Sequence, residues 1–142
     1  MPHLRPLIRS SRARQVLLGV TALVFAGIAV ASLLAPDLMA RGVGYTLDSV
    51  DARSEFRAVY VGVWLATAVL LVVALRQVEQ PLIGDLGALL VLGQSVGRLL
   101  SLVLDGAPGP RVWPMFVLET LGGIALLVVR PSPSRGETRA EG

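Results

Sequence analysis

The chain has 142 residues, of which 54% are hydrophobic and only 16% are charged, and its mean hydropathy is +0.69. An average soluble domain carries about a quarter charged residues, so this composition excludes a disordered chain and an ordinary water-soluble domain. The net charge is +3, but the arginines are dispersed without interleaved aromatic residues, so no nucleic-acid binding is expected. There is no cysteine and the one histidine is His3, so we expect no metal site, no catalytic triad and no cofactor.

Four apolar segments are long enough to cross the hydrocarbon core of a bilayer, which takes about 20 helical residues. In chain order they are Val16–Ala35, Ala58–Leu75, Leu86–Leu104 and Val112–Val129. The third is interrupted only by Arg98 and the fourth only by Glu119, and none alternates like a barrel strand. The sequence predicts an all-α integral membrane four-helix bundle over residues 16–130, after a basic cytoplasmic leader (1–15) and before a disordered cytoplasmic tail (131–142).

Arginines near the ends of these segments predict the orientation, because cytoplasmic loops carry an excess of basic residues. Eight arginines fall on one side, namely Arg5, Arg9, Arg12, Arg14, Arg76, Arg130, Arg135 and Arg139, against Arg41, Arg53, Arg57 and Arg111 on the other. We therefore expect both termini in the cytoplasm. The basic start, the apolar run and Ala29-Val30-Ala31 also match a signal peptide, but the run is long for one, so we expect the first segment to stay uncleaved.

The connection over residues 36–57 carries the signals of a partly helical cap over the outer end of the bundle. Pro36 opens a turn that glycines close. Asp48 is expected to be the N-cap of a helix that begins near Ser49, with Asp51 in its first turn, where a negative charge is favourable.

Polar side chains inside the segments point to a shared pocket, because a charge in hydrocarbon costs about 2.5–3.5 kcal/mol and turns toward protein or water. Two stripes recur at helical spacing: Arg57, Tyr60, Trp64 and Thr67 on the second segment, and Gln94, Arg98, Ser101 and Asp105 on the third. Arg98 and Glu119 lie at similar depths, about 10–12 Å inside the outer boundary. We predict that Arg98 and Glu119 form an ion pair. The candidate binding residues are Arg57, Tyr60, Trp64, Gln94, Arg98, Ser101, Asp105 and Glu119.

These polar groups admit three interpretations. They form structural ion pairs that fix helix register, Arg98 with Glu119 and Arg57 with Asp105 or Glu55. Alternatively, they line a pocket for a ligand or substrate, or they form a path for an ion or a proton.

Two motifs carry a resemblance to a known family: Arg53-Ser54-Glu55-Phe56-Arg57-Ala58-Val59-Tyr60, and the run from Gly97 through Arg98, Ser101 and Asp105 to Pro108. Over roughly residues 14–130 the chain resembles the bacterial four-span membrane proteins grouped as domain of unknown function 4345. Val61 departs from the family's commoner glycine. The resemblance implies a four-helix integral membrane protein and supplies no activity. We expect a multi-pass protein of the bacterial inner membrane.

Three functions remain open. The first is a non-catalytic membrane protein, structural or partner-binding, of open oligomeric state, whose partners are the bilayer and a lipophilic ligand or another membrane protein. The second is a small isomerase, cyclase or hydrolase acting on a lipophilic substrate, with Glu119 or Asp105 as acid or base and Arg98 or Arg57 stabilising an anion. The third is a small transporter subunit. Small multidrug transporters, which also have four short spans, rely on an acidic residue within the first helix. This function is disfavoured because Val16–Ala35 contains no acidic residue. A pocket with unpaired carboxylate oxygens would favour the enzyme, whereas fully paired charges with no cavity would favour the first function.

Overall fold

The computed structural model describes residues 8–131, and almost all of its regular structure is helical. The elements are β1 (Ile8–Arg9), α1 (Ser11–Leu34), α2 (Pro36–Gly42), α3 (Val50–Arg57), the π-helix η1 (Ala58–Val63), α4 (Trp64–Arg76), α5 (Pro81–Leu104), α6 (Trp113–Val128) and β2 (Val129–Arg130). The expected all-α class is therefore confirmed, with a pair of two-residue strands as the exception. Most of the predicted leader (1–7) and tail (132–142) lies outside the described residues.

The helices reach beyond the charge-free runs that predicted them. Helix α1 begins at Ser11 within the expected leader, because Ser10 caps it and accepts a hydrogen bond from the amide of Ala13 at 3.2 Å. Helix α5 begins at Pro81, a residue that suits a first helical turn because it needs no amide partner there. The first and last residues of a charge-free run therefore mark the limits of the apolar stretch and not those of the helix.

Three helical stretches are long and apolar enough to cross a membrane: Ser11–Leu34, Val50–Arg76 and Pro81–Leu104. Helix α6 has 16 residues, so its axis is about 24 Å long, short of a hydrocarbon core of about 30 Å. The fourth predicted segment is thus a helix, but a shorter one than the other three.

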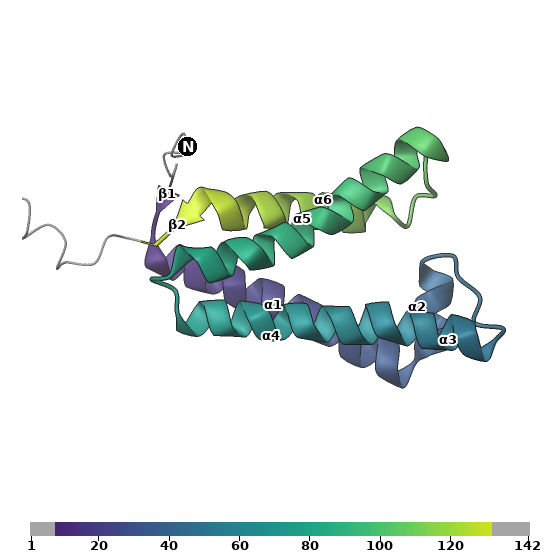
Figure 1. Ribbon diagram of the computed structural model, residues 1–142. Helices are drawn as coiled ribbons and strands as arrows, with labels where there is room; N and C mark the ends of the chain where they lie inside the picture. The colour runs from purple at the N-terminus through teal and green to yellow at the C-terminus, as the bar shows by residue number, and fades with distance from the viewer. Residues whose placement is uncertain (1–7, 132–142) are drawn as a thin grey trace, which may run out of the picture.

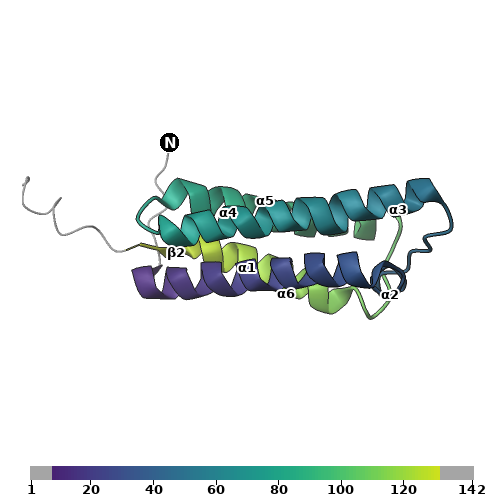
Figure 2. The ribbon, with the colours of Figure 1, turned by 90° about the horizontal axis from the view of Figure 1, so that it is seen from below.

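Helices α1, α4, α5 and α6 lie side by side along one axis, arranged as two pairs (Figure 1). Helix α1 packs mainly on α4, and α5 packs mainly on α6. In Figure 1 the two pairs are close together at the end that carries β1 and β2, and they diverge toward the end that carries α2 and α3. Figure 2, seen from below, shows α1 lying beside α4, with η1 and α3 continuing the row of α4 toward the end that carries α2. We call these ends the strand end and the cap end.

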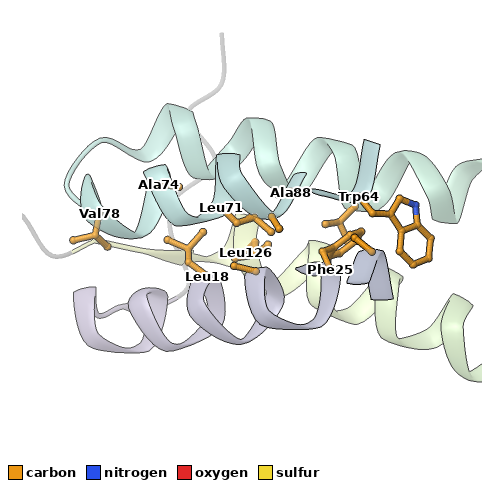
Figure 3. Packing of buried hydrophobic residues seen from close by; sticks show 12 residues of the cluster. Leu18, Phe25, Trp64, Leu71, Ala74, Val78, Ala88 and Leu126 are labelled. Atoms are coloured by element: carbon orange, nitrogen blue, oxygen red, sulfur yellow. The ribbon is translucent and has the colours of Figure 1, made fainter. Parts of the chain in front are cut away.

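The apolar core fills the space between the pairs and is densest toward the strand end (Figure 3). Leu18 of α1, Leu71 of α4 and Leu126 of α6 are all 0% exposed. At the other edge of this cluster, Phe25 meets the indole of Trp64 edge to face, with ring centroids 5.5 Å apart. Side chains of both helix pairs interdigitate in this cluster, and this close packing holds the two pairs together.

A buried arginine ties the pairs together at the strand end. Arg14 of α1 is 0% exposed, and its guanidinium donates to the carbonyls of Leu126 and Val129 at 2.9 and 2.6 Å. It also donates to the carbonyl of Pro81 at 3.0 Å and to Asp85 Oδ1 at 3.2 Å. These carbonyls include the last turn of α6, where a cation is favourable. One side chain thus fixes α1 to both helices of the other pair.

Two features complete this cluster of Arg14, Asp85 and Arg130. Arg130 donates to both oxygens of Asp85, at 2.7 and 2.6 Å, and β1 pairs in parallel with β2 so that Arg9 lies opposite Arg130. A Cβ at Gly84 would collide with the Arg14 guanidinium, so the glycine leaves the space that the arginine fills. The predicted orientation counts Arg14 and Arg130 among the arginines of the loops, but in the structure both side chains hold helices together.

The predicted cap over residues 36–57 is partly helical, as expected, and has a small core of its own. Ala40, Leu47 and Phe56 are buried together. Arg53 donates to both oxygens of Asp37 at 3.1 and 2.9 Å, which joins α3 to α2 and holds the pKa of the Asp37 carboxyl below its usual value.

The predicted N-cap of this helix was wrong by one residue. Ser49, not Asp48, accepts a hydrogen bond from the amide of Ala52, at 3.0 Å, and α3 begins at Val50. Asp51 lies in the first turn, as expected.

Candidate functional site

The predicted ion pair between α5 and α6 is confirmed. Arg98 Nε lies 2.7 Å from Glu119 Oε2, and Arg98 Nη2 lies 3.0 Å from Glu119 Oε1, so the two groups meet through two parallel hydrogen bonds. The Glu119 side chain is only 10% exposed and the Arg98 side chain 24%. Thr120, the residue after Glu119, makes a second polar contact between the same helices: its Oγ1 lies 3.1 Å from the Oγ of Ser95, which is about one turn from Arg98.

Beside Arg98, a groove of about 450 Å³ separates the two helix pairs toward the cap end. One wall comes from η1 and α4, through Val59, Tyr60, Val63 and Trp64; the other comes from α5, through Gln94, Gly97, Arg98 and Ser101. Tyr45, Pro108 and Val112 from the neighbouring connections complete the lining. The groove lies where the pairs diverge in Figure 1, so its position follows from their packing at the opposite end.

The π-helix sets which side chains of the second stretch face this groove. A π turn holds more residues than an α turn, so residues four apart, and not three, continue the same face through it. Phe56 therefore stacks on Tyr60 at 4.5 Å between ring centroids, and Tyr60 lies 5.0 Å from Trp64. Tyr45 adds an edge-to-face contact with Tyr60 at 6.2 Å. The result is a continuous aromatic wall.

Five of the eight predicted binding residues line the groove: Tyr60, Trp64, Gln94, Arg98 and Ser101. Glu119 lies behind Arg98 and holds it. Arg57 is exposed, and no ion pair joins it to Asp105 or Glu55 within residues 8–131, because the π turn carries Arg57 away from the stripe that α-helical spacing predicted. Asp105 is exposed beyond the groove and accepts a hydrogen bond from Ser101, at 3.0 Å between the oxygens.

The sequence missed Tyr45, Gly97 and the valines of the lining. Tyr45 follows Gly44, whose φ of +85° turns the chain back toward η1, and a glycine at the end of a short helix was the available signal. Gly97 lines the groove with nothing within 4 Å of where its Cβ would stand, so the missing side chain is part of the groove's volume.

The chemistry available at the groove is that of hydrogen-bond donors beside a neutralised charge. Both Glu119 oxygens accept a hydrogen bond from Arg98. Among the described residues, Arg98 Nη1 and the Gln94 amide make no hydrogen bond to protein, whereas the hydroxyls of Tyr45 and Tyr60 hydrogen-bond to each other. No group of three acidic or histidine side chains within residues 8–131 could hold a metal ion.

Comparison with known proteins gives a family but no characterised relative. No curated protein and no solved structure shows significant similarity to the chain. The family model described as "Domain of unknown function (DUF4345)" matches residues 13–130, which include all six α-helices apart from the first two residues of α1. The chain therefore belongs to the family of that domain of unknown function, DUF4345.

Proposed function

We propose that this protein is a multi-pass membrane protein that holds a lipophilic molecule in the groove between its helix pairs without carrying out chemistry on it. The proposal has two parts, residence in a membrane and occupation of the groove. The observation that carries it is the groove of about 450 Å³ beside a glutamate whose two oxygens are both paired.

Membrane residence is supported by the surface as well as by the helix lengths. Leu34, Val103 and Leu104 are 77%, 80% and 78% exposed, and Leu23 and Leu118 exceed two thirds. Such a surface is unfavourable in water and ordinary in lipid. Helix α6 is shorter than the hydrocarbon core is thick, but Trp113 at its start and Arg130 just after its end suit the two interfaces. Four crossings would place residues 8 and 131 on the same side.

Binding without catalysis is supported by the state of the candidate acids. An acid–base mechanism needs a carboxyl group within hydrogen-bond reach of the substrate. Glu119 is engaged with Arg98, and Asp105 does not line the groove. Polar groups that line a mostly apolar groove and lack protein partners are typical of sites that orient a ligand.

The test compares two leucines placed on the same helix. Gly97→Leu inserts its side chain into the groove, whereas Gly93→Leu adds the same side chain four residues away, outside the lining; no atom lies within 4 Å of either Cβ position. Native mass spectrometry of the purified protein should show a bound lipophilic molecule in the wild type and in Gly93→Leu, and its loss in Gly97→Leu.

Equal retention in both leucine variants would remove the groove as the binding site. Conversion of the retained molecule to a new product by the purified protein would support the enzyme instead.

A further inference from the structure

We infer that the groove selects a molecule with an uncharged head that carries an oxygen acceptor, such as a carbonyl or ester, and rejects anionic and cationic heads. This inference rests on the proposed function and names the class of ligand that the same site takes.

The charge of the groove wall is the first step. Arg98 is the one ionisable group other than tyrosine that lines the groove, and an arginine in an apolar site ordinarily attracts phosphate or carboxylate. Here Glu119 occupies Arg98 Nε and Nη2 from behind, with hydrogen bonds of 2.7 and 3.0 Å. The pair therefore presents no net charge to the groove. A phosphate would meet the neutralised cation with the carboxylate close behind it, so it would lose its hydration without gaining a counter-ion.

The polar side chains of the groove wall offer mainly hydrogen-bond donors. Arg98 Nη1 and the Gln94 amide nitrogen can only donate, and the hydroxyls of Tyr45 and Tyr60 can donate as well. Arg98 Nη1 and the Gln94 amide nitrogen bond to no protein group within residues 8–131, and the hydroxyls of Tyr45 and Tyr60 hydrogen-bond to each other, which uses only one of their two protons. Unpaired donors are costly in an apolar setting, so the wall favours a ligand that brings an acceptor. Carbonyl, ether and ester oxygens accept hydrogen bonds without carrying a charge.

The walls explain why the rest of the ligand is apolar. Val59, Val63 and Trp64 face it on one side, and on the other the missing side chain of Gly97 leaves room next to α5. A cation is disfavoured because, among the described residues, no carboxylate lines the groove and the aromatic faces of Phe56, Tyr60 and Trp64 are already packed on one another.

The experiment uses Trp64 as a reporter of the groove. The chain has two tryptophans, so Trp113→Phe leaves Trp64 alone, and bromine atoms on a bound chain quench its fluorescence. Three probes with the same dibrominated C18 chain are titrated into the protein in a neutral detergent: the methyl ester, the alkyl phosphate and the alkyl trimethylammonium. The same titrations with Gly97→Leu added give the quenching that comes from the micelle alone.

We expect the methyl ester to bind at least about tenfold more tightly than the phosphate or the ammonium, because either charge would be buried without a partner. Glu119→Gln keeps the shape of the side chain but uncovers the charge of Arg98, so the phosphate should gain about tenfold relative to the ester. The double variant Arg98→Met with Glu119→Met restores a neutral wall and should again prefer the ester to the phosphate.

Each outcome decides one claim. Strongest binding of the phosphate or the ammonium by the wild type, or an unchanged ratio of ester to phosphate affinity in Glu119→Gln, overturns the inference while leaving the groove as a binding site. A preference of the double variant for phosphate overturns the role of charge balance. Quenching that never exceeds that of Gly97→Leu for any probe overturns the proposed function, and the inference with it.

Discussion

At the scale of single residues, this molecule shows two ways of placing an arginine in an apolar protein. Arg98 meets one carboxylate through two parallel hydrogen bonds. Arg14 shares its carboxylate, Asp85, with Arg130 and relies on three backbone carbonyls instead. The first arrangement joins two neighbouring helices, and the second joins helices of different pairs. The two arginines therefore stabilise different parts of the fold.

Replacing Arg14 should be the most damaging change near the strand end. Arg14→Met keeps most of the volume but leaves carbonyls of Pro81, Leu126 and Val129 without their donor, and losing a buried charge partner costs about 3–5 kcal/mol. We expect a large drop in the free energy of unfolding, measured in mixed micelles of a mild and a denaturing detergent. Arg12→Met, on the exposed face of the same helix, is the matched control and should change stability by less than about 0.5 kcal/mol.

Replacing Arg98 and Glu119 should give strongly non-additive losses. Arg98→Ala strands Glu119, and Glu119→Ala strands Arg98, so each single variant should be nearly as unstable as the double variant, or more so. The expected coupling energy is about 1–3 kcal/mol in a double-mutant cycle on folded yield in membranes. Two losses that simply add would show that the groups act independently, in conflict with their 2.7 Å contact.

At the scale of elements, the sequence predicted most of what depends on local pattern. The apolar runs located the helices, and the spacing of Gln94, Arg98 and Ser101 placed them correctly on one face, since a regular helix repeats every 3.6 residues. The same rule failed at Arg57, because η1 is not α-helical there. Periodicity also carried no signal for Asp85, whose two arginines come from distant parts of the chain.

The corrected cap of α3 gives a prediction at this scale. Ser49→Ala removes the oxygen that accepts from the amide of Ala52, which should destabilise α3 by about 1 kcal/mol. Hydrogen exchange over residues 50–57 in detergent should accelerate accordingly. Asp48→Ala, one residue earlier, should change it much less, and the reverse order would restore Asp48 as the cap.

At the scale of the whole molecule, the two ends of the described chain are held together. Ser10 donates its amide to the carbonyl of Arg130 at 2.9 Å, and β1 pairs with β2 in parallel. Residues 8–10 and 129–131 must therefore lie on one side of any membrane that the helices cross. Which side this is depends on charge, and the strand end carries Arg9, Arg12 and Arg76 in addition to the buried cluster.

The last prediction is that the strand end faces the cytoplasm. Basic residues near the ends of spanning segments are retained inside, and the sequence assigns eight arginines to the side of the two termini against four to the other side. The chain contains no cysteine, so single cysteines introduced at exposed positions report orientation without background. Thr46→Cys between α2 and α3, and Ala107→Cys between α5 and α6, should react with a membrane-impermeant maleimide in intact bacterial host cells. Gln77→Cys, in the turn between α4 and α5, should react only after lysis. If only Gln77→Cys reacts in intact cells, the orientation is the reverse of the predicted one. If Thr46→Cys and Gln77→Cys both react, Val50–Arg76 does not cross the membrane.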